Sequence, residues 1–228
     1  MSVLWVAELG SNHGGSKALC FELIRSAVWA GSNLIKLQIG WTKEAQAKYC
    51  ASYDERRFID DWVPDIDAWC KDFGVEWFAS IWSLQGLEVA RAVGMKRYKI
   101  AHQLHDRILT DAICGDDKQV FWSLDGGDND SSRHEWGDHL VTPVYTTTDY
   151  PTMAINDWVK RHYSFGGYSS HMHGIADALI AVARGANYIE KHMTLTKTAD
   201  WPRDRAFSLV PSEFKQMVEI GNEIARLR

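Results

Sequence analysis

The sequence of 228 residues lacks the features that mark membrane, secreted and nucleic-acid-binding proteins. No apolar run is long enough to cross a bilayer, and the first residues lack the basic segment, apolar stretch and cleavage site of a secretion signal. The formal net charge is −5, so no surplus of positive charge indicates a nucleic acid or an anionic membrane as a partner. These absences predict a cytoplasmic protein that binds neither nucleic acids nor membranes.

Cysteine is also scarce. Cys20, Cys50, Cys70 and Cys114 lie far apart and form no C-x-x-C pair. This spacing fits neither a disulfide framework nor a cysteine zinc site, so we expect reduced thiols. Hydrophobic residues make up 46% of the chain, which is enough for a full core in one domain over residues 1–228. The eleven tryptophans are scattered, and we expect them to pack that core.

Short apolar strands alternate with amphipathic helices along the chain. The predicted strands are Val3–Glu8, Leu34–Ile39, Val75–Ser80, Arg97–Ala101, Val120–Leu124, Leu140–Thr146, Gly166–Ser169 and Tyr188–His192. The predicted helices lie between Ser16 and Gly31, over Asp54–Phe73 with a break at Pro64, over Leu84–Val93, Arg107–Cys114 and Ile175–Arg184, and from Ala154 and Pro211 onward. Eight strands separated by helices predict a compact (β/α)8 TIM barrel instead of an open sheet. The linker Asp125–Asp138 is rich in Gly, Asp, Asn and Ser, so the helix between strands five and six is expected to be shortened or missing.

Polar residues gather at the carboxyl ends of the predicted strands. Side chains alternate between the two faces of a strand, and both faces are buried in a barrel, so an inward charge needs a partner or a ligand. The inward polar positions are Glu8, Lys36, Gln38, Ser80, Lys99, Ser123, Thr146, Thr148, Ser169, His171, Glu190 and His192. Barrel enzymes build their active sites at this end, so the pattern predicts an active site there.

Lys36 and Lys99 lie within apolar strands, where a charged side chain is unexpected. A buried ion pair with Glu8 or Glu190 would explain one such lysine. Two lysines beside several hydroxyl groups instead favour a bound phosphate or carboxylate.

His171 and His192 end two neighbouring strands, and Glu190 shares the face of His192. A single buried histidine is usually only hydrogen-bonded, so these two gain weight as a pair. Two imidazoles with nearby carboxylates suit Mn, Fe, Co or Zn, with Mg less natural, and an open coordination position could hold water or a carbonyl oxygen. His13, in the loop after the first strand, is explained equally well as a loop organiser or as a ligand contact.

Several motifs, in chain order, carry a resemblance to a known family. They are Ala7–Gly15, Ile35–Gln38, Tyr98–Ile100, Asp149–Thr152, Tyr168–His171, Glu190–Thr194, Pro202–Asp204 and Ser208. Together they resemble the barrel domain of the sialic acid synthase (N-acetylneuraminate synthase) family over essentially the whole chain. The stretch Glu190–His192 with its downstream Asp204 and Ser208 is specific, and the first-loop motif is nearly as specific.

The resemblance implies a transferase of carbohydrate biosynthesis, a phosphoenolpyruvate-dependent synthase that forms a carbon–carbon bond. It would condense phosphoenolpyruvate with an open-chain amino sugar similar to N-acetylmannosamine, giving a nonulosonic (sialic-type) acid and phosphate. By resemblance, His171 and His192 bind a divalent metal, Mn2+ or Mg2+. Lys36, Lys99, Ser123 and Ser169 would hold phosphoenolpyruvate, with Ser80 a further substrate-binding candidate, and Gln38, Tyr150, Glu8, Glu190 and Asp204 would face the sugar or the reacting water. Glu8, Glu190 and Asp204 are the candidate catalytic residues.

The physical chemistry agrees with these assignments. A metal held by the two histidines would supply Lewis-acid polarisation of the sugar aldehyde, making its carbon electrophilic towards the enol carbon of phosphoenolpyruvate. Water, which Glu8 could orient or deprotonate, then captures the positive charge that develops on the adjacent carbon. Phosphate leaves from the tetrahedral species while Lys36 and Lys99 stabilise its charge.

The chain departs from the family pattern at several positions. Ile81 stands where the family has a threonine near the phosphate, and His102 where it has a serine. Ser170 replaces the usual aspartate before the metal histidine, which removes an expected carboxylate from behind that ring. Family members usually carry a C-terminal antifreeze-like domain that lends an arginine to the partner subunit, and the sequence stops at Arg228 without it. Members are dimers, so a homodimer is a candidate assembly.

Two alternatives to the synthase stay open. A metal-dependent aldolase or sugar isomerase would use the same histidines but would release no phosphate from phosphoenolpyruvate. A non-catalytic barrel that binds an anionic metabolite or a partner protein would explain the changes at Ile81, His102 and Ser170. We favour it less, because buried charges such as Lys36 and Glu190, which are costly to keep, are retained.

Overall fold

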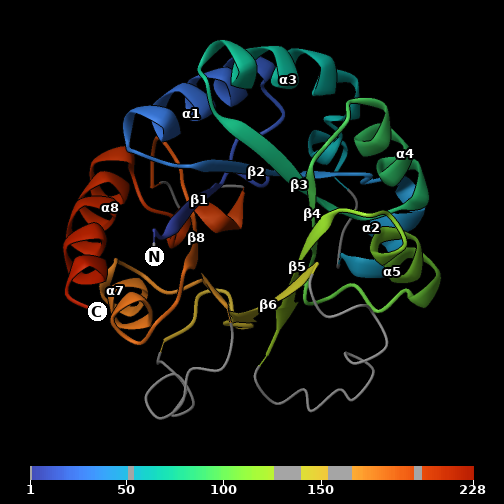
Figure 1. Ribbon diagram of the computed structural model, residues 1–228. Helices are drawn as coiled ribbons and strands as arrows, with labels where there is room; N and C mark the ends of the chain where they lie inside the picture. The colour runs from blue at the N-terminus through green and yellow to red at the C-terminus, as the bar shows by residue number, and fades with distance from the viewer. Residues whose placement is uncertain (1, 51–53, 126–139, 154–165, 198–201) are drawn as a thin grey trace.

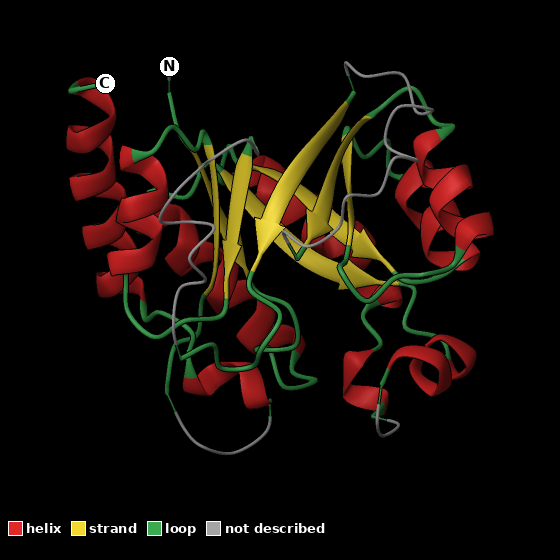
Figure 2. Ribbon diagram, turned by 90° about the horizontal axis from the view of Figure 1, so that it is seen from below, coloured by secondary structure: helices red, strands yellow, loops and turns green. Residues whose placement is uncertain are grey.

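The computed structural model describes residues 2–50, 54–125, 140–153, 166–197 and 202–228. Within them, eight parallel strands pair in chain order and close into a barrel through β1 and β8. The strands are β1 (Leu4–Glu8), β2 (Leu34–Ile39), β3 (Glu76–Ile81), β4 (Arg97–Ile100), β5 (Gln119–Leu124), β6 (Val141–Thr146), β7 (Gly167–Ser170) and β8 (Tyr188–His192). Figure 1 looks down this barrel, and Figure 2 shows from the side that the strand arrows run towards one end.

The longer helices cover the barrel along an arc that runs from α7 and α8 past α1 and α3 to α4 and α5 (Figure 1). The helices are α1 (Lys17–Trp29), α2 (Lys43–Tyr49), α3 (Val63–Asp72), α4 (Leu84–Ala92), α5 (Arg107–Cys114), α7 (Ala176–Ala183) and α8 (Pro211–Arg226), with 3-10 turns η1 (Glu55–Arg57), η2 (Asp60–Trp62) and η4 (Arg203–Ala206). Side chains of Ser16, Thr42, Ser83 and Asp106 accept backbone N–H groups at the starts of α1, α2, α4 and α5. None of the helices described is long and apolar enough to cross a bilayer.

The predicted (β/α)8 barrel is confirmed, and every strand boundary lies within one residue of its prediction. Pro64 lies in the first turn of α3 as expected, but the residues before it form the turns η1 and η2 instead of a helix. The sequence analysis missed α2, because this short helix buries only Ala45 and Gln46 and has no apolar stripe. The segments 126–138 and 154–165 lie outside the described residues, so the missing fifth helix and the helix expected from Ala154 stay predictions.

The pairing register brings the polar strand ends to one level of the barrel. The opposed pairs are Glu8 with Lys36 and with His192, Gln38 with Ser80, Ser80 with Lys99, Thr146 with Ser169, and Ser169 with Glu190. Hydrogen bonding between neighbouring strands fixes this register, so the polar side chains lie together without any contribution from flexible loops.

Aromatic side chains fill the barrel next to this polar layer. Phe121 packs against Phe78 with ring centroids 5.6 Å apart and against Tyr188 at 4.3 Å. All three side chains are buried. The Tyr188 hydroxyl donates to Glu190, and the ammonium of Lys99 lies 5.3 Å from the centre of the Tyr188 ring. The polar layer therefore lies against buried aromatic side chains, which exclude water from one side of its charges.

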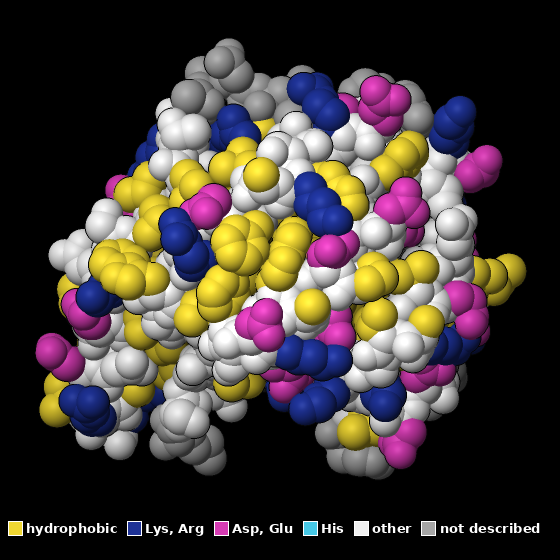
Figure 3. Space-filling view, turned by 90° about the horizontal axis from the view of Figure 1, so that it is seen from above, with side chains coloured by type: hydrophobic (Ala, Val, Ile, Leu, Met, Phe, Trp, Pro, Cys, Tyr) yellow, Lys and Arg dark blue, Asp and Glu magenta, His cyan; other side chains and the backbone are white. Residues whose placement is uncertain are grey.

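The outer surface carries charge differently. On the face drawn in Figure 3, Lys and Arg side chains are interspersed with Asp and Glu, and hydrophobic side chains lie between them. Opposite charges mixed in this way screen one another and give no extended field of one sign on that face.

Candidate functional site

A cavity of about 430 Å³ opens at the carboxyl end of the barrel. The predicted site residues that line it are Lys36, Gln38, Ser80, Lys99, Ser123, Tyr150, Ser169, His171, Glu190, His192 and Asp204. Glu8 is fully buried next to it and forms an ion pair with Lys36. The structure thus brings all the predicted site residues together, while the role of each stays a prediction.

Other residues singled out in the sequence have mixed outcomes. His102 lines the cavity, and its Nε2 lies 3.8 Å from Asp125 Oδ2. Ile81 is fully buried and does not line it. Thr148 is exposed, so the prediction that it points inward is wrong; β6 ends at Thr146, and the alternation of faces ends with it.

His13 belongs to the first loop and not to the cavity lining. Its Nδ1 accepts the N–H of Gly15 at 3.1 Å, and its buried ring lies edge-on to Trp62 at 5.5 Å. Of the two explanations that the sequence left open, these contacts favour the loop organiser.

The two inward lysines share two carboxylates. Lys36 forms an ion pair with Glu8 and lies 3.3 Å from Glu190 Oε1, and Lys99 donates to Glu190 Oε2 at 3.0 Å. Lys36 also donates to Ser80 Oγ at 3.1 Å. Each lysine therefore has a carboxylate partner, as the simple ion-pair explanation requires. Both also line an open cavity, so the pairs leave room for a ligand beside them.

Burial and charge set the protonation of this cluster. Burial lowers the pKa of Lys99 to about 8 although Glu190 opposes it. Burial acts on Lys36 in the same direction, but Glu190 and Glu8 outweigh it and raise the pKa of that lysine. Burial raises the pKa of Glu8, whereas for Glu190 the neighbouring lysines outweigh burial and hold its pKa below the usual range. The two lysines therefore favour the charged form of Glu190, whereas burial favours the protonated form of Glu8.

The imidazoles of His171 and His192 face one another, with ring centroids 5.3 Å apart. The edge of Phe207 packs against both rings, at 5.5 and 5.3 Å, and Tyr150 packs on His171 at 3.9 Å. Burial lowers the pKa of both histidines to about 3, so both are neutral at physiological pH. Neutral imidazole is the form that binds metal ions.

The free ring nitrogens of His171 and His192 and the oxygen atoms near them decide whether a divalent cation fits between the two rings. His171 Nδ1 contacts the carbonyl oxygen of Thr147, which leaves Nε2 available. His192 Nδ1 is buried without a hydrogen-bond partner and lies 3.8 Å from Asp204 Oδ2. Among the residues described, no three His, Cys, Asp or Glu side chains converge into a complete metal site. The donors fit a cation held by two imidazoles, with Asp204 nearby and the other positions filled by water or substrate.

A buried polar network lies behind the two histidines. Ser170 Oγ contacts the carboxylate of Asp177, which comes from α7. Lys191 Nζ donates to Ser170 Oγ at 3.0 Å and to the carbonyl oxygen of Met172 at 2.8 Å, and lies 3.3 Å from Asp177 Oδ1. The Tyr168 hydroxyl donates to Asp177 at 2.9 Å.

This network places a carboxylate beside Ser170, because Asp177 reaches Ser170 Oγ from α7. The replacement of a family aspartate by Ser170 stays a prediction. Ser170 precedes His171 and Lys191 precedes His192, so the pair Lys191–Asp177 fixes the backbone beside both rings.

Two stacked tryptophans, Trp41 and Trp82, line part of the cavity. Trp41 stacks on Trp82 with ring centroids 4.1 Å apart, and Trp41 Nε1 donates to Gln38 Oε1 at 3.0 Å. Both indoles are buried in the core, as expected of the tryptophans, but they also line the cavity, which the sequence analysis missed. No periodic pattern marks them, because both lie just after the strands β2 and β3 end.

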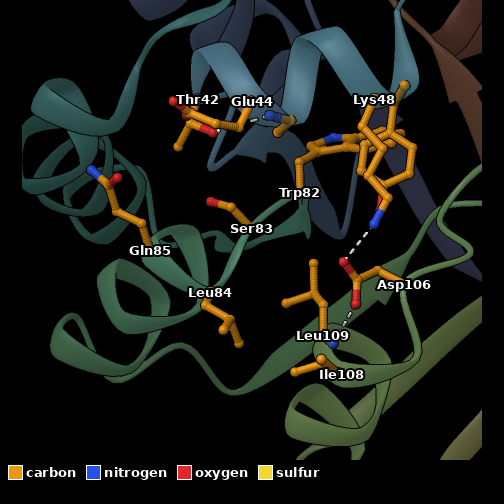
Figure 4. A pocket seen from close by; sticks show the side chains of 12 residues that line it. Thr42, Glu44, Lys48, Trp82, Ser83, Leu84, Gln85, Asp106, Ile108 and Leu109 are labelled. Atoms are coloured by element: carbon orange, nitrogen blue, oxygen red, sulfur yellow. Dashed lines mark hydrogen bonds and ion pairs between the residues drawn. The ribbon is translucent and has the colours of Figure 1, made fainter.

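A second hollow of about 370 Å³ adjoins the cavity, and Tyr49 and Trp82 line both. Figure 4 shows Lys48 and Asp106 facing one another across part of it, joined by an ion pair of 2.7 Å. Leu84 and Ile108 lie at its rim and are largely exposed. None of the residues that line this hollow is a predicted site residue.

Comparisons with known proteins identify the family and the fold. A family model described as the NeuB family matches residues 23–129 and 141–227. A pseudaminic acid synthase of Campylobacter jejuni is 28% identical over 250 residues, which cover 95% of this chain and 72% of that protein. An N,N'-diacetyllegionaminic acid synthase of the same species is 26% identical over 247 residues, with coverages of 94% and 74%. The crystal structure of an N-acetylneuraminic acid (sialic acid) synthetase from Leptospira borgpetersenii in complex with citrate has a TM-score of 0.84 and 26% identity, and the match covers 100% of this chain and 85% of that one.

The facing imidazoles predict metal retention. Purified protein should hold a divalent cation, and His171→Ala or His192→Ala should lose it, because a single imidazole remains. Elemental analysis measures the metal content. His173→Ala is the matched control, since this exposed histidine lies two residues from His171 and should leave the metal content unchanged. Equal metal in all three variants would contradict the prediction.

The network behind the rings predicts a large stability effect. Asp177→Ala should lower the free energy of unfolding by about 3–5 kcal/mol, because it leaves the ammonium of Lys191 buried without its carboxylate. Adding Ser170→Asp should recover much of this loss by returning a carboxylate from the strand. Chemical denaturation measures both, with the exposed Asp72→Ala as a control expected to change stability by less than about 0.5 kcal/mol. The account is wrong if Asp177→Ala behaves like the control or the double variant recovers nothing.

Proposed function

The chain belongs to the NeuB family, and from this we propose that it is a synthase that condenses phosphoenolpyruvate with an open-chain amino sugar. The products would be a nonulosonic acid and inorganic phosphate. One observation carries the proposal: two buried ammonium groups, two facing neutral imidazoles and the carboxylates of Glu190 and Asp204 line one cavity at the barrel mouth, with Glu8 buried beside it. The similarity to pseudaminic and legionaminic acid synthases supports the product class.

Lys36 and Lys99 form the basic side of the cavity, where the phosphate and carboxylate of phosphoenolpyruvate would bind. Hydroxyl groups surround them: Ser169 donates to Glu190 Oε1 at 2.8 Å, and Thr146 donates to Ser123 Oγ at 2.8 Å. The carboxylates hold the ammonium groups in position before a ligand arrives, so little reorganisation accompanies binding. The same charges would stabilise the phosphate as it leaves.

The acceptor sugar would lie on the opposite side, near Gln38, Tyr150 and Asp204. Trp41 fixes the amide of Gln38, and Tyr150 packs on His171. A divalent cation bound at the two imidazoles would supply Lewis-acid polarisation of the sugar aldehyde.

Glu8 is the proposed proton acceptor for the water that adds to the reacting carbon. Burial raises its pKa, which brings the carboxyl closer to the working pH of a general base. Its Oε1 is buried and has no hydrogen-bond partner among the described residues. Gly10 keeps the space beside this oxygen open, because a Cβ there would lie 2.7 Å from Glu8 Oε1.

Incubation with a divalent metal, phosphoenolpyruvate and a panel of aldoses tests the function. We expect phosphate release together with a product whose mass equals the two carbon skeletons joined. Lys36→Met and Lys99→Met should each lower kcat/KM by about a hundredfold or more, because the phosphate loses a buried cation. The exposed Lys96→Met is the control. Sugar cleavage or isomerisation without phosphate release would instead identify an aldolase or isomerase, and no turnover of any aldose would favour the non-catalytic barrel.

Lys99 gives the binding of phosphoenolpyruvate a pH dependence. Its pKa of about 8 in the ligand-free protein means that it loses its proton as the pH rises through that value. Affinity should therefore be full below pH 8 and fall by up to about tenfold per pH unit above it. Calorimetric titration between pH 7 and 9.5 measures this. Lys99→Arg, which stays charged, should remove the fall, and an unchanged fall would show that another group causes it.

A further inference from the structure

Arg57 places a third cation in the cavity. This residue of η1 lines the cavity, and its guanidinium lies over the ring of Trp41, 5.3 Å from its centre. Its Nε is buried and has no hydrogen-bond partner among the residues that the structure describes. Within the described part of the chain, its side chain forms no ion pair. The neighbouring Arg56 differs, because it points to the surface and pairs with Asp54 at 2.7 Å.

The charge of Arg57 is therefore not compensated in the way that the lysine charges are. Lys36 and Lys99 each contact a carboxylate. The carboxylates of Asp204 and Asp54 are within electrostatic reach, since Arg57 acts against burial to lower the pKa of both, but no ion pair joins either to Arg57 in the described part of the chain. A partly buried cation without a partner is costly, and an anionic ligand would remove that cost.

The position of Arg57 indicates which ligand it faces. It packs on Trp41, and Trp41 in turn holds Gln38. Gln38 and Asp204 are the residues proposed to meet the acceptor, whereas the lysines proposed to hold phosphoenolpyruvate pair with Glu8 and Glu190. Arg57 therefore belongs to the acceptor side of the cavity.

We propose that Arg57 binds an anionic group of the acceptor, so that the acceptor of this synthase is an acidic amino sugar that carries a phosphate or a carboxylate. This inference rests on the proposed function and narrows its substrate class. A guanidinium presents parallel N–H donors that match two oxygens of either group, and its contact with the indole of Trp41 limits its motion. Phosphate and carboxylate both offer two accepting oxygens, and acceptors that carry one or the other distinguish between them.

Three acceptors test the proposal: an N-acyl hexosamine, its 6-phosphate and the corresponding uronic acid with a 6-carboxylate. At saturating phosphoenolpyruvate, one of the acidic acceptors should exceed the neutral sugar at least about tenfold in kcat/KM. Arg57→Met should abolish this preference by raising KM for the acidic acceptor, with KM for phosphoenolpyruvate within about twofold of wild type. Arg57→Lys should keep part of the preference, and Arg56→Met, the surface control, should keep all of it.

Stability separates this role from a structural one. Because Arg57 has no ion pair to lose, Arg57→Met should be at least as stable as wild type in thermal unfolding. A variant that melts well below wild type would show that Arg57 has a structural partner and would overturn the proposal.

Two further results would overturn it while the synthase survives. One is a wild-type enzyme that uses the neutral sugar as well as the acidic ones; the other is an Arg57→Met variant whose KM rises for phosphoenolpyruvate instead. Calorimetric titration of the hexosamine phosphate alone, without metal or phosphoenolpyruvate, separates the inference from the function. If no acceptor is condensed but this ligand binds wild type and not Arg57→Met, the anion site stands and the synthase assignment fails.

Discussion

The ion cluster of Lys36, Lys99, Glu8 and Glu190 is the constraint on which the site depends. Two ammonium groups and two carboxylates are buried next to the aromatic side chains of Phe78, Phe121 and Tyr188, where an unpaired charge would be costly. The carboxylates make the lysines tolerable in the folded protein, and the open cavity beside them leaves the ammonium groups within reach of a ligand. A cluster that served stability alone could be replaced by packed apolar side chains, so its presence beside an open cavity favours a role in binding.

The cavity divides into sides of different character. The lysine side has its charges balanced in advance, which suits the tight, oriented binding of a phosphorylated enol acid. The side formed by Arg57 and Trp41 carries a cation that forms no ion pair with any residue the structure describes, so an anionic ligand would supply the missing partner. The imidazoles of His171 and His192 lie at the same mouth, and their burial keeps them neutral and able to bind a cation. Specificity for the second substrate would therefore depend on Arg57 and Trp41, which follow β2, together with Gln38, Tyr150 and Asp204.

Strand-borne features could be predicted from the sequence because a strand has a period of two. Apolar runs gave the boundaries of the strands to within one residue, and alternation placed the Lys36 and Glu190 side chains inside the barrel. Features created by packing between distant segments carry no such signal. Asp177 reaches Ser170 from a helix, and Phe207 reaches both imidazoles from the turn that follows η4. Arg57 looks like any surface arginine until the fold turns it towards Trp41.

Crystals grown with manganese and phosphoenolpyruvate, measured at the manganese absorption edge, test the central claim most directly. The account predicts an anomalous peak beside the rings of His171 and His192, and density for the enol phosphate against the ammonium groups of Lys36 and Lys99 in the same cavity. Phosphoenolpyruvate bound elsewhere, for example in the hollow lined by Lys48 and Trp82, or manganese absent from the imidazoles, would contradict it.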